Sequence, residues 1–336
     1  MAKAKKPARR GAANKKASIG GAAAPASTPR SKTTNIYSGG MPISAALATE
    51  IAKIEAVLKQ EVWLVTTGIE PYLHRMLLQH KAALPKTKIA VLIDSGGGYA
   101  ESAYRTAMLL RRTCGGFTAI VPRYAKSAAT LLALGADSII LGDDAELGPL
   151  DAQFADYDVE ESTVSALDTV QAVEQLENSA SDVALKMLRF LQQRTRKKYS
   201  VLMEPSLHFA AEITKPLFEK IDAVRYSRQS RILQEAQDYA ERLLQPKFEK
   251  KQAKAIARDL VTNYPTHQFC IDREEAKRIG TVIDEDTGKS VDDPVGLHVI
   301  APPPSLQDTF NWLALNVSTL FAIGKIVDSP PPKAQP

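Results

Sequence analysis

Four short apolar runs divide the first half of the sequence and limit what the chain can fold into. They lie at residues 62–66, 88–93, 117–121 and 138–141, and the second, KIAVLI, has no polar residue after its first. Continuous apolar runs of this length are typical of parallel strands that are covered on both faces. Helical spacing follows at 71–84 and 100–112, and a helix of small residues is expected at 125–135. The alternation predicts an α/β fold with right-handed crossovers.

The pattern changes in the second half of the sequence. Between residues 161 and 260 the chain has long charged stretches of helix-forming composition, which predict a mostly helical region. A first helix is expected at 45–60, where the folded body begins, and APPP at 301–304 indicates a linker. The uncharged stretch 309–324 is too short to span a membrane unaided. It predicts a docking or oligomerising helix, with weak membrane anchoring as the alternative.

The positive charge of the chain is concentrated at its start. The net charge of the chain is +5. Residues 1–49 contain nine Lys/Arg and no Asp/Glu, so the rest of the chain is mildly acidic. Residues 1–44 have too few large apolar side chains to offset the entropy of ordering, which predicts a disordered basic arm. Such an arm can bind an acidic partner, nucleic acid or a membrane surface, or act only as a solubilising tail.

Two further features bear on where the protein is found. No apolar segment follows the early charges, so the sequence does not indicate a secretory signal. Cys114 and Cys270 lie far apart and match no metal or redox spacing, which argues against a disulfide framework. We therefore expect a cytoplasmic protein.

A glycine-rich turn follows the buried run at 88–93. Gly96, Gly97 and Gly98 stand between this predicted strand and a predicted helix, where backbone N–H groups can approach a ligand closely. Such a turn can donate hydrogen bonds to an oxyanion, cradle a phosphate or simply reverse the chain. The dinucleotide-binding pattern would need a third glycine at position 101, where Glu101 stands, and a Walker lysine is also missing.

A serine stands one predicted strand later, in the segment YAKSAAT. Ser127 lies at a predicted strand-to-helix junction, where the helix dipole and free N–H groups favour an attacking alkoxide. An ordinary helix-capping serine would have the same setting. The order of glycine turn, serine segment and a following LGPLD turn is what favours a nucleophile over a cap.

These segments resemble the Clp and crotonase superfamily, and most closely the serine dehydrogenase proteinase family. That family has a D-[ST]-x-G-G loop, an A-x-S-A-x-T segment and an L-G-P-[IL]-D-x-Q turn in this order. The corresponding segments here are IDSGGGYAES, YAKSAATLLALGAD and AELGPLDAQF, and NYPTHQFCIDREEAKRIG is loosely similar to the closing motif. The resemblance implies a spiral of β-β-α units with a helical C-terminal half. It divides the chain into the arm at 1–44, a peptidase domain at 45–300, and a linker with a C-terminal helix at 301–336.

The resemblance also implies roles for individual residues. Ser127 would be the nucleophile, and the N–H groups of Gly98 and Ala128 would form the oxyanion hole. Substrate binding would fall to Gly96, Gly97 and Tyr99. The implied protein is a homo-oligomeric serine protease that cleaves a peptide or protein substrate through an acyl-enzyme and needs no cofactor or metal. Lys126 stands where relatives often have an uncharged residue, so it changes the local electrostatics.

The general base is less defined by the sequence. A Clp-type triad needs a histidine soon after the serine, yet no histidine occurs between His80 and His208. Signal peptide peptidases use a Ser-Lys dyad instead, and Lys186 in the apolar context ALKMLRF is the first candidate for such a base. His267 is the second candidate, because sequence distance does not fix distance in space. Asp151 can either orient the base or cap the following loop.

Two other functions fit parts of the pattern. The first is a catalytically inactive Clp-like scaffold that oligomerises and uses the basic arm to recruit nucleic acid or membrane, and the missing nearby histidine favours it. The second is crotonase-like chemistry on acyl thioesters, which uses the same pair of amides in an oxyanion hole. The serine segment counts against this second function, because those enzymes need no nucleophile at that position.

Overall fold

A six-stranded sheet carries the fold in the order β10-β1-β2-β3-β5-β9. In that order the strands are Ile323–Lys325, Val62–Val65, Ile89–Ile93, Phe117–Val121, Ser138–Leu141 and Val299–Ile300. Strands β1, β2, β3, β5 and β9 pair in parallel with their neighbours in this order, whereas β10 pairs with β1 in the antiparallel direction. The computed structural model describes residues 45–151, 153–155, 163–281, 294–317 and 323–325, and the predicted arm at 1–44 lies outside them.

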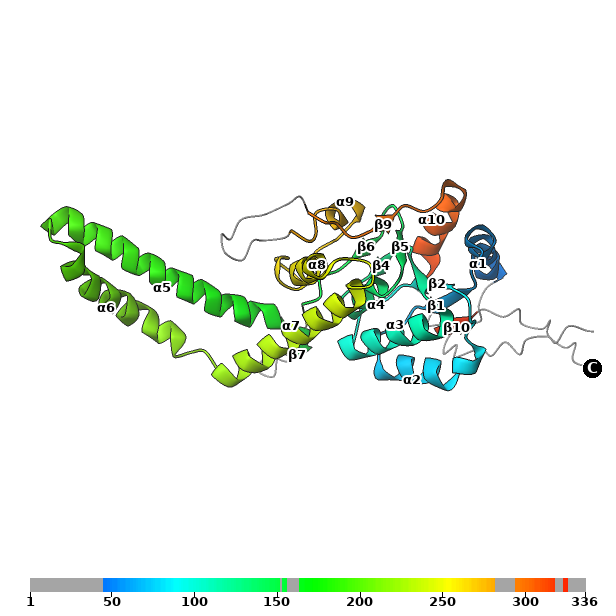
Figure 1. Cartoon of the computed structure of the whole chain (residues 1–336), viewed down its shortest axis with the longest axis horizontal. Helices are drawn as coiled ribbons and strands as arrows, with labels where there is room; N and C mark the ends of the chain where they lie inside the picture. Colours follow the sequence, from blue (N-terminus) through cyan, green and yellow to red (C-terminus); the bar gives the residue numbers. More distant parts are fainter. Residues whose placement is uncertain (1–44, 152, 156–162, 282–293, 318–322, 326–336) are drawn as a thin grey trace, which may run out of the picture. The chain divides into compact units, whose positions relative to one another are not determined.

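Helices connect these strands and make up most of the second half of the described chain (Figure 1). The α/β sheet with a helical C-terminal half, predicted from the sequence, is confirmed. The helices are α1 (Ala45–Leu58), α2 (Pro71–Gln79), α3 (Ala100–Cys114), α4 (Ala128–Leu134), α5 (Ala166–Thr195), α6 (Tyr199–Phe218), α7 (Ala223–Leu244), α8 (Lys250–Thr262), α9 (Arg273–Ala276) and α10 (Gln307–Asn316). Short 3₁₀ turns at Lys81–Ala83 and Pro304–Leu306 complete the set.

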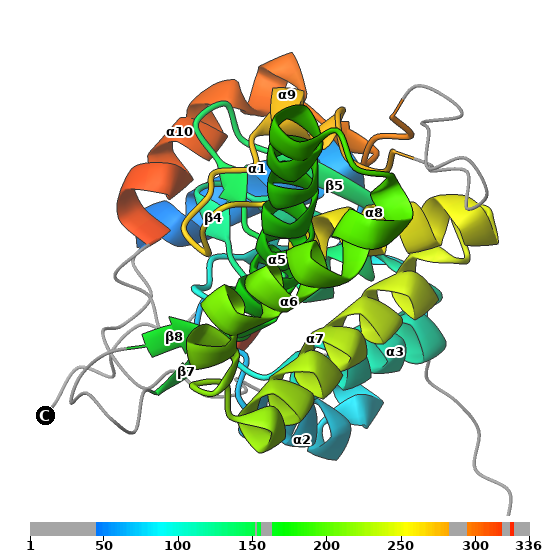
Figure 2. The same ribbon diagram turned by 90° about the vertical axis from the view of Figure 1, so that its left-hand side faces the viewer.

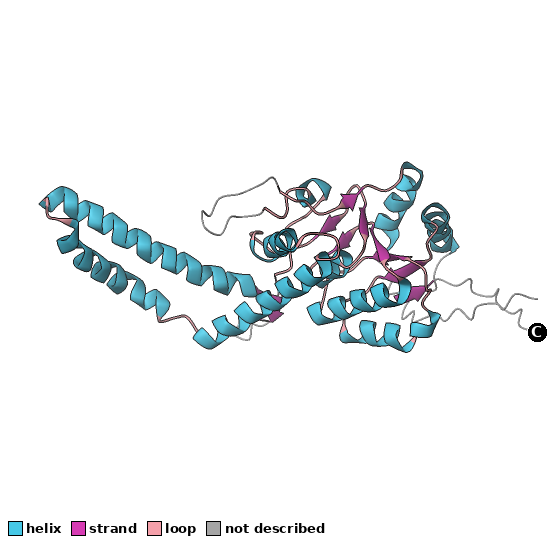
Figure 3. Cartoon of the chain, in the orientation of Figure 1, coloured by secondary structure: helices cyan, strands magenta, loops and turns pink. Residues whose placement is uncertain are grey.

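The sheet buries both of its faces, which explains the uninterrupted apolar runs of the sequence. Alternate side chains such as Leu64, Leu92 and Ile120 pack in one cluster with α1 and α10. The residues between them, such as Val91 and Ala119, pack in a second cluster with α2, α3, α4, α7 and α8. Figure 3 shows the strands between these helical layers. Successive side chains of a strand point to opposite faces of the sheet. Because both faces of this sheet are apolar, each needs a layer of helices to cover it.

A second, smaller layer of strands lies beside the main sheet and produces the predicted β-β-α units. After β3 the chain adds β4 (Tyr124–Ala125), and after β5 it adds β6 (Glu146–Leu147), which pairs with β4 in parallel. After β2, Ser95 forms a single parallel bridge with Ala125 before α3 begins. A main strand, a short second-layer segment and a helix therefore repeat along the chain. One further antiparallel pair, β7 (Gln153–Ala155) with β8 (Thr163–Ser165), precedes α5.

The described residues beyond position 300 pack into the same body. Phe310 and Leu313 of α10 lie in the cluster with Ile51 and Ile54 of α1. The helix expected at 309–324 therefore docks within its own chain and ends at Asn316, and β10 extends the sheet. Among the described helices, none is long and apolar enough to cross a membrane. The predicted boundary at residue 300 stays a prediction.

Two half-buried cations close the C-terminal end of α4, the helix that begins just after Ser127. Lys247 Nζ donates to the carbonyl oxygens of Leu134 at 2.9 Å and Ala136 at 2.6 Å. Arg111 Nε donates to the carbonyl oxygen of Gly135 at 2.7 Å. All seven residues of α4 are buried, so its last carbonyls need partners from the protein. Positive charge at this end also complements the helix dipole.

The position of Lys247 predicts a pH dependence of folding stability. Burial lowers the pKa of Lys247 to about 8, whereas an unfolded lysine has a pKa of about 10.4. Between these values the unfolded state binds more protons, so stability rises as the pH increases from 8 towards 10. Urea unfolding at pH 7.5 and 9.5 should show wild-type stability rising relative to Lys247→Met by on the order of 1 to 2 kcal/mol. Parallel pH profiles for the two proteins would contradict this.

Candidate active site

Ser127 occupies a strained backbone position at the start of α4. Its φ and ψ are 51° and −120°, and it follows β4 directly as the N-terminal cap of the helix. A positive φ in a residue other than glycine costs energy and is often found at functional sites. The side chain is half-buried and makes no capping hydrogen bond to the helix. The hydroxyl is therefore not used as a cap, and the free N–H groups of the helix lie beside it.

The glycine turn lies directly against the serine segment. Ser95 N–H donates to the carbonyl of Tyr124 at 3.2 Å, and Lys126 N–H donates to the carbonyl of Ser95 at 3.0 Å. A Cβ on Gly97, whose φ is +112°, would lie 2.9 Å from the Cβ of Ser127 and 2.8 Å from the carbonyl oxygen of Lys126. Only glycine allows this approach. The two segments that the sequence singled out therefore lie side by side.

The other side of the glycine turn is held by the segment before α2. Ile69 N–H donates to the carbonyl of Gly97 at 2.8 Å, and Tyr99 N–H donates to the carbonyl of Ile69 at 2.9 Å. A Cβ on Gly98, whose φ is +145°, would meet the carbonyl oxygen of Ile69 at 2.7 Å. The turn is therefore fixed from both sides, which preorganises its backbone N–H groups.

A cavity of about 640 Å³ opens over Ser127. Of the residues predicted to form the site, Gly96, Gly98, Tyr99, Ser127 and Ala128 line it, and Gly97 instead packs behind the serine. The remaining wall is mostly apolar and comes from α3, α4, α7 and two loops: Ala100, Glu101, Leu131, Leu150, Ile232, Glu235, Ala236 and His267. An apolar cleft with a few convergent polar groups is the usual form of a binding site.

His267 lines this cavity and is paired with a buried carboxylate. Its Nδ1 lies 2.9 Å from Oδ1 of Asp151, and the two side chains are 13% and 3% exposed. The other carboxylate oxygen of Asp151 accepts a hydrogen bond from Ser165 Oγ at 2.8 Å. Ser165 also caps α5, because its Oγ accepts from Leu167 N–H at 3.1 Å. Both oxygens of Asp151 are engaged, so the carboxylate holds the imidazole in a fixed orientation.

Contacts across long sequence distances bring His267 to the cavity that Ser127 also lines. Leu147 of β6 and Ile271 exchange two backbone hydrogen bonds of 2.9 and 3.1 Å, which align the loop at 264–270 with the LGPLD turn. Lys126 Nζ donates to the carbonyl of Phe269 at 3.2 Å and pairs with Glu146 at 2.9 Å. Lys126, next to Ser127, thus links the serine segment to the histidine loop.

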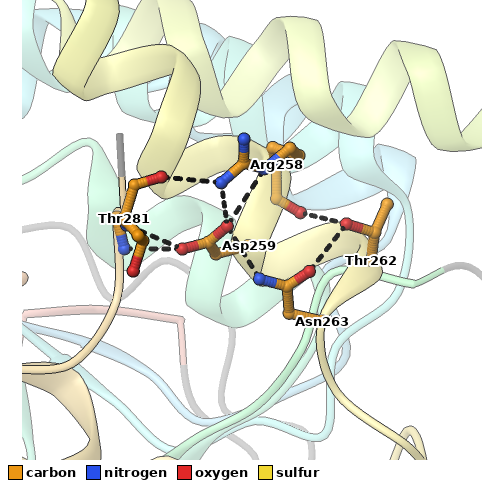
Figure 4. Close-up of polar contacts among 6 residues, drawn as sticks. Arg258, Asp259, Thr262, Asn263 and Thr281 are labelled. Atoms are coloured by element: carbon orange, nitrogen blue, oxygen red, sulfur yellow. Dashed lines mark hydrogen bonds and ion pairs between the residues drawn. The ribbon is translucent and has the colours of Figure 1, made fainter. Parts of the chain in front are cut away.

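A buried aspartate fixes the end of α8, just before the histidine loop (Figure 4). Asp259 Oδ1 accepts from Arg258 at 2.7 Å and from Asn263 Nδ2 at 2.8 Å. Its Oδ2 accepts from the N–H groups of Gly280 at 2.8 Å and Thr281 at 3.0 Å. One carboxylate therefore holds the chain on both sides of the histidine loop.

The structure does not bring Lys186 to the serine. Its side chain is 77% exposed on α5, lies 3.9 Å from Asp182 and does not line the cavity. An exposed lysine that does not line the cavity is unsuited to act as a general base for Ser127. His267, the second candidate from the sequence, lies in the cavity instead, and Asp151 contacts its ring. The sequence signal that could have favoured His267 is its place in the closing motif NYPTHQFCID.

Residues 74–205, somewhat less than half of the chain, match the family of ClpP-like SDH-type serine proteinases. For this stretch the predicted family is confirmed. It contains Ser127, the glycine turn, Asp151 and Lys186, whereas His267 lies beyond it. The family is one of serine proteinases, which supports a peptidase.

Similar proteins and solved structures give weaker evidence than the family match. Two uncharacterized proteins of Methanocaldococcus jannaschii are 28% and 23% identical over 216 and 203 residues. These matches cover 64% and 60% of this chain but only 60% and 54% of the relatives, which is less than two thirds.

Among solved structures, a mutant of the membrane-bound stomatin-specific protease 1510-N aligns with 16% identity and a TM-score of 0.28. That alignment covers 43% of this chain and 69% of the other. The ClpP catalytic domain from Plasmodium falciparum aligns with 14% identity and a TM-score of 0.22, over 29% of this chain and 57% of that domain. Similarity this low supports no conclusion about this chain.

The contact between Gly97 and Ser127 predicts the effect of adding one methyl group to the turn. Gly97→Ala should displace the serine segment, because the new Cβ would overlap backbone atoms and φ is +112°. We expect a loss of about 2 kcal/mol or more in unfolding free energy, measured by urea unfolding. Gly96→Ala is the matched control, because its Cβ would have no neighbour within 4 Å. Equal stability of the two variants would contradict the close contact.

Proposed function

We propose that the protein is a serine peptidase in which Ser127 attacks, His267 is the general base and Asp151 orients the histidine. This triad replaces the Ser-Lys dyad that the sequence suggested. The observation that carries it is the His267–Asp151 pair, which opens into the same cavity as the strained Ser127. The preferred substrate class is a peptide or protein, since the matched family is one of proteinases.

In the proposed reaction, His267 Nε2 takes the proton of the Ser127 hydroxyl as its oxygen bonds to the scissile carbonyl carbon. The resulting oxyanion is stabilised by the N–H groups of Gly98 and Ala128. Collapse of the intermediate breaks the C–N bond, and His267 returns the proton to the leaving amine. Water, activated by the same histidine, then cleaves the acyl-enzyme ester and restores the serine.

The environment of each group suits its proposed role. With Nδ1–H donated to Asp151, the lone pair of Nε2 is free to accept a proton, and the buried carboxylate stabilises the imidazolium that forms. The N-terminus of α4 places partial positive charge beside the reacting oxygen. Burial of Asp151 keeps its interaction with the histidine from being weakened by water.

The first test asks whether the Ser127 hydroxyl is activated. The wild-type protein should react with a fluorophosphonate probe and carry it on Ser127 by peptide mass spectrometry, because an activated serine attacks phosphorus readily. Ser127→Ala should lose both labelling and casein hydrolysis while keeping the wild-type circular dichroism spectrum. Absence of labelling in folded wild-type protein would overturn the proposal and favour the inactive scaffold.

The second test separates the triad from the dyad. His267→Asn should slow fluorophosphonate labelling by about a thousandfold, since the hydroxyl loses its base, and Asp151→Asn should slow it by a smaller factor. Lys186→Ala should label at the wild-type rate. A large loss in Lys186→Ala with an unaffected His267→Asn would restore the Ser-Lys dyad.

Other partners stay proposals. We infer a homo-oligomer on the basis of the family resemblance. Binding of acidic partners, nucleic acid or membrane by the basic arm concerns residues 1–44, which lie outside the described structure.

A further inference from the structure

The paired helices α5 and α6 have almost no core of their own. They lie side by side over most of their length (Figures 1 and 2). In α5, which the structure describes throughout, no residue after Leu167 is buried. In α6 the buried residues form a single seam with a spacing of four: Leu202, Ser206, Ala210 and Thr214. Because the two helices meet along one narrow seam, most of their apolar side chains stay exposed to solvent or to a binding partner.

Large apolar side chains flank this seam on α6. On one flank are Val201, Phe209, Ile213 and Leu217, and on the other are Met203 and Leu207. Their exposed fractions run from 40% for Phe209 to 56% for Val201. Met203, Leu207 and Ala211 also line a groove of about 560 Å³. We call the exposed apolar residues of α6, together with Leu185 and Phe190 of α5, the hairpin surface. Clusters of exposed large apolar side chains mark interaction surfaces.

The charges of α5 are separated along the helix. Every acidic residue lies in the first part and every basic residue in the second part, in the order Asp168, Glu174, Glu177, Asp182, Lys186, Arg189, Arg194. The sign changes between residues 182 and 186, close to the middle of the helix. A second α5 laid antiparallel would place acidic against basic residues at both ends, whereas a parallel one would place like charges together.

We propose that the hairpin surface is covered by the hairpin surface of a second copy of this chain, with the two α5 helices antiparallel. An antiparallel pair has twofold symmetry, so each copy offers the same patch and satisfies the other. A lipid surface fits less well, because helices that lie on membranes carry basic residues along their polar face, and the first part of α5 is acidic. This inference is independent of the proposed chemistry at Ser127.

The first experiment removes the apolar contact. Met203→Glu/Leu207→Glu should weaken self-association by on the order of 100-fold or more in sedimentation velocity over a dilution series, because charged groups would be buried between the copies. The matched control is Val57→Glu/Leu78→Glu, which changes exposed apolar residues of α1 and α2 outside the hairpin and should leave self-association unchanged. Circular dichroism checks that both variants are folded.

The second experiment tests the orientation through charge. Lys186→Glu/Arg189→Glu leaves Arg194 as the only basic residue of α5, and Glu177→Lys/Asp182→Lys makes the helix more basic. Each variant alone should self-associate at least tenfold more weakly than wild type at 50 mM salt, and an equimolar mixture should recover the association. Since these residues are exposed, this test also stands if the apolar variant misfolds.

Three outcomes would overturn the proposal. The first is a wild-type protein that stays monomeric at 100 µM, and the second is an equal loss of association in Met203→Glu/Leu207→Glu and in its control. The third is a monomer that co-sediments with phosphatidylcholine/phosphatidylglycerol vesicles through Met203 and Leu207, which would assign the surface to lipid. Fluorophosphonate labelling of Ser127 reports separately on the proposed activity.

Discussion

The rest of the site depends on the contact between the backbone of Gly97 and the segment that contains Ser127. With a positive φ and no side chain, Gly97 lets two chain reversals after neighbouring strands come so close that a Cβ added to it would lie 2.9 Å from the Cβ of Ser127. The strained Ser127 sits at this contact, where helix α4 begins. Any larger residue would separate Ser127, the proposed nucleophile, from the amides that are proposed to hold the same carbonyl.

The second layer of short strands explains how distant segments reach this contact. Ser95, Ala125, Leu147 and Ile271 are joined in sequence by backbone bridges or by the pairing of β4 with β6. Each of these residues stands next to a part of the site: the glycine turn, the serine, the aspartate turn and the histidine loop. The main sheet provides the rigid support, and the small layer sets the order of the functional segments.

Near the site, the buried and half-buried charged side chains contact polar or charged partners. Asp151 contacts His267 and Ser165, Lys126 contacts Glu146 and Phe269, and Asp259 binds the chain on both sides of the histidine loop. A buried ion that loses its partner is strongly destabilising, so these pairs constrain the geometry. Ser165 also caps α5, so the helix with the separated charges begins at a serine that donates to the aspartate of the proposed triad.

The sequence by itself determined the α/β alternation, the helical second half and the position of Ser127 beside a glycine turn, because burial on both sheet faces and tight glycine geometry leave local signals. It did not determine the base. Lys186 lies in a local context that resembles a buried helix, yet its side chain is exposed, because α5 packs mainly on α6 and α7 and no residue of this helix after Leu167 is buried. His267 reaches the cavity through long-range contacts such as the pairing of Leu147 with Ile271, which are more than 100 residues apart. Contacts of that range depend on the whole fold, so only the tertiary structure could show which of the two residues lies in the cavity.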